Sequence, residues 1–227
     1  MMNRRFFVAA GAVAGLSACA PAIPKPPPEP PRPVWPPLPA FYGAIYDEPY
    51  PIPAVPEGIV DPRLWRQSVD NPYPGDPVGS IVVDPGQGYL YLLESRDRAL
   101  RYGVGTGRQA FSWSGVARMQ FKRKWPVWRP TANMIARDPS LEPYSVANGG
   151  MRPGPPNPLG SRALYLFQNG VDTYYRIHGG CEPQFLGKAV SAGCIRMLDQ
   201  DAIDLYDRVG HGVNVRVLWA DQLDEAP

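Results

Sequence analysis

The chain has 227 residues, of which 44% are hydrophobic and 19% charged, and it contains 30 prolines and 23 glycines. This length accommodates one globular domain and an extended segment, since proline at this density has to be concentrated in some part of the chain. Lys and Arg total 23 against 21 Asp and Glu, a balance that argues against a nucleic-acid partner or a polybasic membrane contact.

The first 18 residues have the pattern of a signal peptide for export. Arg4 and Arg5 precede an apolar run over residues 6–16, which is too short to span a bilayer. Two arginines followed by two phenylalanines also resemble a twin-arginine signal. No run of 18 or more apolar residues occurs elsewhere, so a multi-span membrane protein is excluded. Removal of the two arginines leaves 21 basic and 21 acidic residues, a neutral chain.

Leu16-Ser17-Ala18-Cys19 resembles a bacterial lipobox, in which the cysteine is acylated and becomes the new N-terminus. On this interpretation Cys19 carries the lipid, and Ala20 after it favours the outer membrane over the inner one. The alternative is an ordinary cleaved signal with a chance cysteine, but the proline-rich sequence that follows favours the lipoprotein. We therefore expect a periplasmic protein whose only membrane contact is its N-terminal lipid, at the inner leaflet of the outer membrane.

Residues 19–77 are expected to form a lipidated cysteine, a proline-rich tether and a strap. Residues 20–40 hold 11 prolines, which favours polyproline II and a reach of about 65 Å at roughly 3.1 Å per residue. Simple disorder is the alternative for this tether. Between residues 41 and 77 large apolar side chains join the prolines. Because their exposure would be unfavourable, we expect this strap to lie against the domain.

The globular domain is expected over residues 78–220, followed by a tail at 221–227, and its signals are mostly those of β-strands. Runs at 80–84 and 89–95 flank Pro-Gly-Gln-Gly, which predicts a hairpin. One helix is predicted at 200–209, with Asp199 as its cap and Gly210 as its stop. Further strands are predicted at 99–105, 163–168, 172–178 and 213–219, with a turn at Gln168-Asn169-Gly170.

A long stretch from residue 107 to residue 160 has no strong periodicity. It contains three tryptophans, many prolines and the basic run Lys122-Arg123-Lys124. Segments of this length are usually functional, which favours a lid or substrate wall, whereas the alternative is a packed insertion with tryptophans in its core. Three basic residues on a loop are typical of solvated surface.

Few residues in the chain are suited to nucleophilic chemistry. Three cysteines and two histidines are present, and with Cys19 assigned to lipid the candidates are Cys181, Cys194 and His178, since His211 between two glycines has the pattern of a surface turn. A cysteine nucleophile needs a base to form its thiolate, and small residues beside it allow backbone N–H groups to converge on an oxyanion. In an exported protein, however, Cys181 and Cys194 could equally form a disulfide.

The sequence around Cys194 resembles a known family. Ile177-His178-Gly179 is followed by Leu186-Gly187-Lys188-Ala189-Val190-Ser191-Ala192-Gly193-Cys194-Ile195-Arg196-Met197. A histidine, then Ser-x-Gly-Cys and an arginine, is a specific motif that resembles the active-site signature of the L,D-transpeptidases, with their YkuD-type catalytic domain, and of the ErfK/YbiS-like members in particular. The likeness extends to residues 102–108, 157–160 and 213–217, so it covers most of residues 78–219.

This resemblance implies a mainly β fold: a YkuD-type β-sandwich of mixed sheets with a short C-terminal helix and a long lid-like insertion. It implies a peptidoglycan L,D-transpeptidase that forms a cysteine acyl-enzyme. The donor would be a tetrapeptide stem, cleaved after its third residue, usually meso-diaminopimelate, with release of D-alanine. The acceptor would be another stem, an outer-membrane protein or lipoprotein, a free D-amino acid, or water. No metal or organic cofactor is implied.

The family's catalytic roles carry over by position. Cys194 corresponds to the nucleophile and His178 to the general base. The backbone carbonyl of Gly179 corresponds to the third member of the triad, which fixes the imidazole tautomer. The backbone N–H groups of Gly193, Cys194 and Ala192 would form the oxyanion hole, where the loss of one donor costs on the order of 10²–10³ in rate.

Two further signature residues, Arg196 and Ser191, are candidates for substrate binding. Arg196 could bind a substrate carboxylate or brace the cysteine loop. Many relatives have histidine where this chain has Ala192, so an auxiliary histidine function is not expected. Cys181 is also unusual for the family, which leaves two hypotheses: a free thiol, or a reversible Cys181–Cys194 disulfide that blocks the nucleophile.

Two other functions remain open beside cross-linking or protein attachment. The same cysteine could serve an L,D-carboxypeptidase or a D-amino-acid exchange enzyme, which differ only in the acceptor. The fold could also serve as a non-catalytic, lipid-anchored peptidoglycan-binding protein. The presence of His178, Cys194 and Arg196 argues against that last function, because a pure binding module has no need of a thiol there.

Overall fold

The computed structural model describes residues 35–107, 114–191 and 193–218. The chain divides into two units, Met1–Val34 and Trp35–Pro227, and everything below concerns the second. The predicted signal peptide, Cys19, most of the tether, Ala192 and the tail at 221–227 therefore lie outside the described residues. Within the described residues, no helix has the length and apolar character needed to cross a membrane.

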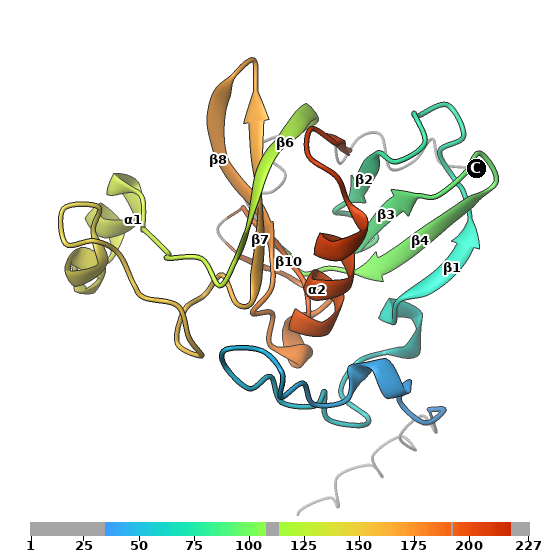
Figure 1. The fold of residues 1–227 in the computed structure, drawn as a ribbon, viewed down its shortest axis with the longest axis horizontal. Helices are drawn as coiled ribbons and strands as arrows, with labels where there is room; N and C mark the ends of the chain where they lie inside the picture. The colour runs from blue at the N-terminus through green and yellow to red at the C-terminus, as the bar shows by residue number, and fades with distance from the viewer. Residues whose placement is uncertain (1–34, 108–113, 192, 219–227) are drawn as a thin grey trace, which may run out of the picture. The chain divides into compact units, whose positions relative to one another are not determined.

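One mixed sheet of nine strands forms the centre of the domain, which confirms the mainly β fold class (Figure 1). Its strand order is β1-β4-β3-β2-β11-β6-β7-β8-β10. The pairs β2–β11 and β8–β10 are parallel and the others antiparallel. The strands are β1 (Gln67–Asp70), β2 (Ile81–Asp84), β3 (Tyr89–Leu93), β4 (Arg98–Gly103), β6 (Gly115–Lys124), β7 (Arg162–Gln168), β8 (Val171–His178), β10 (Ile195–Arg196) and β11 (Asn214–Val217). Two short strands, β5 (Thr106–Gly107) and β9 (Ala189–Ser191), pair separately.

The helices described are short. α2 (Asp199–Arg208) packs against the sheet, and Ala202, Leu205 and Val209 contribute to the core as their spacing predicts. α1 (Ala132–Arg137) packs beside a 3₁₀ turn, η4 (Pro139–Tyr144), and neither buries a side chain. In Figure 1 α1 lies to one side of the sheet. Three more 3₁₀ turns are η1 (Ala40–Tyr42), η2 (Pro62–Leu64) and η5 (Pro183–Phe185).

The predicted hairpins β2–β3 and β7–β8 and the strands β4 and β11 are present, but β6 was not predicted. Its ten residues lie within the stretch that shows no strong periodicity in the sequence. Exposed and buried side chains alternate over residues 116–120, after which a register shift interrupts the pattern. Lys122, Arg123 and Lys124 therefore end a strand and do not lie on a loop. The Lys122 ammonium donates to the carbonyl oxygen of Val209 at 2.7 Å.

Both faces of β2 and β3 are buried, because alternate side chains enter different cores. Ile81 and Leu90 belong to the core beneath α2, whereas Val82 and Tyr91 belong to a second core. The strap, residues 41–77, covers this second face with four buried side chains: Tyr42, Val55, Val60 and Leu64.

Polar contacts fix the strap to the domain. Tyr42 donates its hydroxyl hydrogen to Asp201 at 3.0 Å. Glu48 pairs with both terminal nitrogens of Arg162, at 2.5 and 3.0 Å, and accepts from the Trp125 indole at 2.7 Å. Gln200 donates to the carbonyl of Pro53 at 2.9 Å. This part of the strap is therefore held by buried and partly buried hydrogen bonds as well as by apolar packing.

Candidate active site

The pairing of β8 with β10 brings the histidine and cysteine segments together. In this parallel pair Ile195 lies beside Ile177, and Arg196 lies beside His178. Both isoleucines point into the core beneath α2. Since side chains alternate across a strand, His178, Arg196 and the preceding Cys194 belong to the opposite face. Residues predicted from the sequence as nucleophile, base and substrate contact thus share one face of the sheet.

Cys194 follows a turn that only glycine can form. Gly193 has φ +128°, and a Cβ there would come within 2.8 Å of the Tyr175 ring. The Cys194 thiol is partly exposed and lies 3.9 Å from the carbonyl oxygen of Tyr174, to which it donates a weak hydrogen bond. Burial raises the pKa of this thiol, while nearby arginines oppose the shift. At neutral pH the sulfur is therefore protonated and needs a base before it can attack.

The hydrogen bonding of His178 leaves one ring nitrogen able to accept a proton. Its side chain is 4% exposed, and Nδ1 lies 2.7 Å from the carbonyl oxygen of Gly179. Because a carbonyl only accepts, Nδ1 carries the hydrogen and Nε2 is left as the proton acceptor. Burial lowers the pKa of His178 to about 4, so the imidazole is neutral at physiological pH.

The turn that supplies this carbonyl is held by Asp199, a role that the sequence did not reveal. Asp199 was predicted to cap α2, but the N-cap residue is Leu198 and makes no side-chain cap hydrogen bond. Instead, Asp199 Oδ1 accepts from the backbone N–H and the hydroxyl of Ser161, at 2.7 and 2.6 Å. A Cβ on Gly179 would lie 2.1 Å from this oxygen. Gly179 also donates its N–H to the carbonyl of Arg162 at 3.0 Å.

Arg196 is fixed in place through its backbone. Its backbone exchanges two hydrogen bonds of 2.8 Å with Gly105. Its guanidinium is partly buried, and no described residue makes an ion pair or hydrogen bond with it. The backbone of Ser191 lies in β9 beside Gly107. Ala192, the third predicted oxyanion donor, lies outside the described residues.

Cys181 and Cys194 are not joined to each other in the structure, so the disulfide considered above is not formed there. Cys181 belongs to the core beneath the strap and is 6% exposed. Its thiol donates to the carbonyl of Glu182 at 3.6 Å. Burial raises the pKa of Cys181 to about 12, which suppresses its reactivity in the folded protein.

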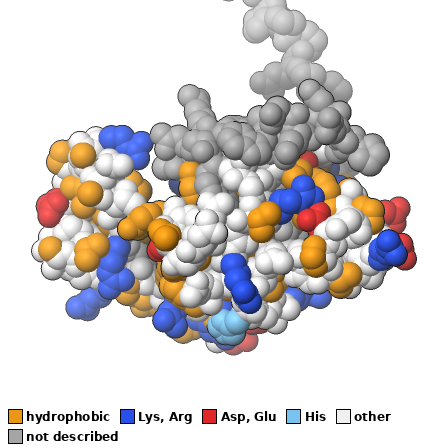
Figure 2. Space-filling view, turned by 90° about the horizontal axis from the view of Figure 1, so that it is seen from above, with side chains coloured by type: hydrophobic (Ala, Val, Ile, Leu, Met, Phe, Trp, Pro, Cys, Tyr) orange, Lys and Arg blue, Asp and Glu red, His pale blue; other side chains and the backbone are white. Residues whose placement is uncertain are grey.

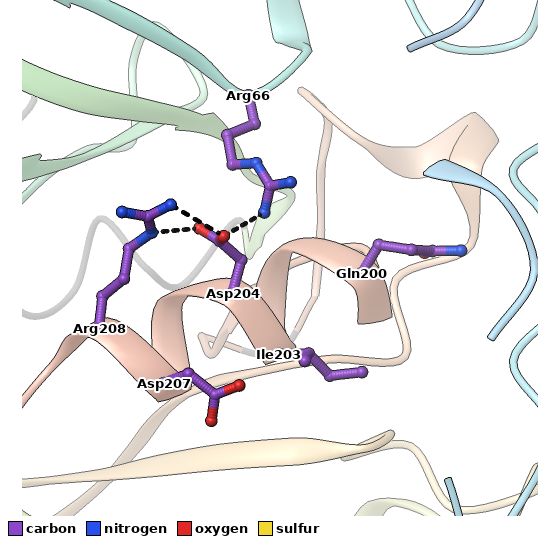
Figure 3. A pocket seen from close by; sticks show the side chains of 6 residues that line it. All are labelled: Arg66, Gln200, Ile203, Asp204, Asp207 and Arg208. Carbon is purple, nitrogen blue, oxygen red and sulfur yellow. Dashed lines mark hydrogen bonds and ion pairs between the residues drawn. The ribbon is translucent and has the colours of Figure 1, made fainter. Parts of the chain in front are cut away.

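Two cavities lie apart from this face. The first, of about 410 Å³, is lined by α2 and Arg66 (Figure 3). There Asp204 pairs with Arg66 at 2.8 Å and with Arg208 at 2.7 Å, so these charges are satisfied internally. The second, of about 490 Å³, lies between the strap and residues 181–184 and 198–200. Neither cavity is lined by His178 or Cys194.

Charge on the described surface is dispersed. In Figure 2 the basic side chains stand in separate groups, with acidic and hydrophobic side chains between them. On this face the described residues form no continuous basic field of the kind that binds a polyanion.

Comparison with known proteins gives a consistent family. The model for the YkuD L,D-transpeptidase catalytic domain matches residues 79–217. The "Putative L,D-transpeptidase in ATP synthase subunits region ORF 5" of Fuscovulum blasticum is 33% identical over 104 residues, or 46% of this chain and 49% of that protein. The "Probable L,D-transpeptidase ErfK/SrfK" of Salmonella typhimurium is 32% identical over 122 residues, or 52% of this chain and 36% of that protein. The chain thus spans half or less of the length of these curated relatives.

A solved structure from Brucella melitensis, described as a probable carnitine operon oxidoreductase caia, is 46% identical. The matched region covers 70% of this chain and 96% of the Brucella chain, and the two structures superpose with a TM-score of 0.49. Its description applies to that protein alone. The family model, by contrast, spans every strand of the nine-stranded sheet except β1, and it includes the turn of His178 and the loop of Cys194. On this match, the chain belongs to the L,D-transpeptidase catalytic-domain family.

Proposed function

We propose that the protein is a peptidoglycan L,D-transpeptidase that acts on tetrapeptide stems through a thioester on Cys194. One observation carries the proposal beyond family membership. The hydrogen bond between His178 Nδ1 and Gly179 fixes the tautomer that leaves Nε2 as a base, on the same sheet face as the thiol.

In the proposed reaction the Cys194 sulfur attacks the carbonyl carbon that links the third stem residue to D-alanine. His178 Nε2 takes the thiol proton and delivers it to the departing amine, so the C–N bond breaks and D-alanine leaves. An acceptor amine then attacks the thioester, loses a proton to His178 and regenerates the thiol, which receives that proton. The N–H groups of Gly193 and Cys194, with Ala192, are the proposed donors to the oxyanion.

The shifted pKa values favour a particular order of events. The thiol pKa is raised, and that of His178 is lowered to about 4. A thiolate–imidazolium pair is therefore unfavourable before substrate arrives, because each pKa unit of mismatch costs about 1.4 kcal/mol. Proton transfer to His178 then accompanies carbon–sulfur bond formation instead of preceding it.

Substrate recognition is assigned to Arg196, with Ser191 as a second contact from the same segment. An arginine whose side chain pairs with no other described residue can form a bidentate pair with a carboxylate of the stem peptide. Arg196 lies beside His178 in the strand register, which would place such a carboxylate close to the reacting bond.

The product of the proposed reaction depends on which acceptor attacks the thioester, and two acceptors are proposed. An amine of a second stem would give a diaminopimelate-to-diaminopimelate cross-link, and an amine of an outer-membrane protein or lipoprotein would attach that protein to the wall. Water or a free D-amino acid would give an L,D-carboxypeptidase or an exchange enzyme instead.

Mass spectrometry of the products tests the reaction. Reduced full-length protein is incubated with a purified disaccharide-tetrapeptide, beside Cys194→Ala and His178→Ala variants whose folding is verified by circular dichroism. Dimers that lack one D-alanine, formed by the wild type alone, are expected. A tripeptide alone would redirect the proposal to hydrolysis. Unchanged substrate would support the binding-module alternative, and turnover by Cys194→Ala would refute the nucleophile assignment.

Location is a separate proposal: export by a twin-arginine-like signal, acylation of Cys19, and residence in the periplasm at the outer membrane. Radiolabelled palmitate is expected to enter the protein and to be absent from a Cys19→Ala variant. A mature mass without diacylglycerol would contradict this assignment.

A further inference from the structure

Strand β8 departs from regular geometry just before the catalytic histidine. Tyr174 has φ +61°, a left-handed conformation that non-glycine residues seldom adopt. Asp172 Oδ1 accepts from the backbone N–H of Tyr174 at 2.9 Å, and the Thr173 hydroxyl accepts from that of Tyr175 at 3.1 Å. These contacts hold the Tyr174 carbonyl towards Cys194, whose sulfur lies 3.9 Å from its oxygen.

The same aspartate fixes Arg176. The two terminal nitrogens of the guanidinium each donate to a different oxygen of Asp172 at 2.7 Å, and one also donates to the Tyr175 carbonyl at 2.8 Å. The guanidinium carbon stands 4.3 Å from the centre of the Tyr165 ring, and the side chain is only 12% exposed. Such a bidentate, stacked arginine has little freedom to move.

Aromatic rings extend this support across the sheet. Tyr165 stacks on Phe121, with ring centres 4.4 Å apart and planes 21° apart. Arg123 covers the Phe121 ring at 5.2 Å. Arg176 covers one face of Tyr165, Arg123 covers Phe121, and the two rings stack on each other. These aromatic side chains therefore offer no open face on which a sugar could stack. Their arrangement instead fixes Arg176 from the side of β7.

The strand register places this arginine next to the nucleophile. Arg196 lies beside His178 and Ile195 beside Ile177, so the next residue back, Cys194, falls beside Arg176. Arg176 and Cys194 thus share the face that carries His178 and Arg196. The Cys194 thiol is acted on by the backbone N–H of Arg176 and by the charges of Arg176 from β8 and Arg196 from β10, with His178 as the proposed base. Asp172, which pairs with the Arg176 guanidinium, offsets part of its charge.

We infer that Arg176, held by Asp172 and Tyr165, is a positioning residue for the nucleophile and that its fixed positive charge stabilises the Cys194 thiolate. The inference rests on the proposed function only in taking Cys194 as the reactive cysteine. It assigns to Arg176 a role different from that of Arg196, whose guanidinium stays available for substrate.

Alkylation of Cys194 measures this role without any substrate. The full-length protein, reduced, is treated with iodoacetamide at several pH values. Trypsin, which cuts after Lys188 and Arg196, releases residues 189–196 with Cys194 as their one cysteine. The modified fraction of this peptide gives the alkylation rate, independently of Cys19 and Cys181, and its dependence on pH gives the midpoint of thiolate formation.

Charge removal by Arg176→Gln and by Arg176→Met is expected to raise this midpoint by up to about one pH unit, the low end of the range of one to three units for a neighbouring opposite charge. The low end applies because Asp172 offsets part of the charge and the backbone N–H of residue 176 remains in each variant. The alkylation rate at pH 7 then falls roughly threefold, because a tenfold loss of thiolate is partly offset by its greater nucleophilicity. Arg176→Lys should restore much of the midpoint. The matched control is Arg216→Gln, because Arg216 also forms a bidentate pair, with Asp76, and stacks on Tyr73.

Melting curves identify which charge-removing variant folds, and either one suffices. A midpoint equal to that of Arg216→Gln would overturn the inference and leave Arg176 a purely structural residue. The inference would also be overturned if the midpoint rose as much in Arg176→Lys as in Arg176→Met, because the positive charge kept by lysine would then have no effect on the thiolate. If the alkylation results agree with expectation but no transpeptidation occurs, the proposed function fails while this inference stands.

Discussion

Replacing Glu48 with glutamine removes the negative charge that faces Arg162, deep beneath the strap. The Arg162 side chain is 1% exposed, and Glu48 is its one ion-pair partner among the described residues. Loss of one partner of a buried pair costs about 3–5 kcal/mol, because the other charge stays buried without compensation. The glutamine amide oxygen can still accept one hydrogen bond, so we expect about 3 kcal/mol. In a domain of this size that corresponds to a melting temperature lower by roughly 6–12 °C.

Thermal and urea unfolding of the full-length protein at pH 7 measure this loss. The matched control is Glu94→Gln, because Glu94 forms a surface pair with Arg208 at 3.6 Å with both side chains more than one-third exposed. Exposed pairs contribute about 0–1 kcal/mol. If Glu48→Gln were no more destabilising than Glu94→Gln, the reasoning from burial would be refuted.

The same pair predicts a pH dependence with a definite sign. The hydrogen bond from Arg162 lowers the pKa of Glu48 below its usual value. A carboxyl with a depressed pKa in the folded state contributes stability above its unfolded pKa, near 4.3, and this contribution is lost as the pH falls through the folded pKa. The stability difference between the wild type and Glu48→Gln should therefore shrink below about pH 4.

Three further outcomes are expected. Gly179→Ala should lower turnover at least tenfold, because its methyl would meet Asp199 at 2.1 Å, whereas Gly210→Ala, with open space around it, should behave like the wild type. The acid limb of turnover should fall near pH 4 instead of pH 6.5, since burial lowers the pKa of His178, and a pH–rate profile with a limb at 6.5 would contradict the neutral-base assignment. Cys181 should resist iodoacetamide in the native protein at pH 8 and react after denaturation, because its thiol is buried and its pKa is about 12; peptide mapping that finds rapid native labelling would contradict this.

Local patterns in the sequence were sufficient to predict the elements that are determined by residues close together in the chain. The two hairpins follow from turn residues between apolar runs, and α2 follows from its 3.6-residue period. The His178 and Cys194 segments were recognised from residue order, and the register of β8 and β10 brings them to one face.

What the sequence did not reveal depends on partners that are distant along the chain. Glu48 and Arg162 are separated by 114 positions, and nothing local indicates that they pair. Asp199 has the pattern of a helix cap, yet Ser161 and the turn at Gly179 take up its carboxylate. Strand β6 was missed because a register shift interrupts its alternation and basic residues form its end.

The position of the strap determines where tension on the N-terminal side of the chain enters the domain. Residues of the strap precede the segment matched by the family model, which begins at residue 79, and any tension transmitted along the chain from its N-terminal side reaches them first. Tyr42 then pulls on Asp201 at the start of α2, and Glu48 pulls on Arg162, whose carbonyl accepts from Gly179 in the turn that orients His178. Arg162 thus contacts both the strap and the turn next to His178, so a pull on the N-terminal chain would be transmitted towards the candidate active site through Glu48 and towards β2 and β3 through Tyr42.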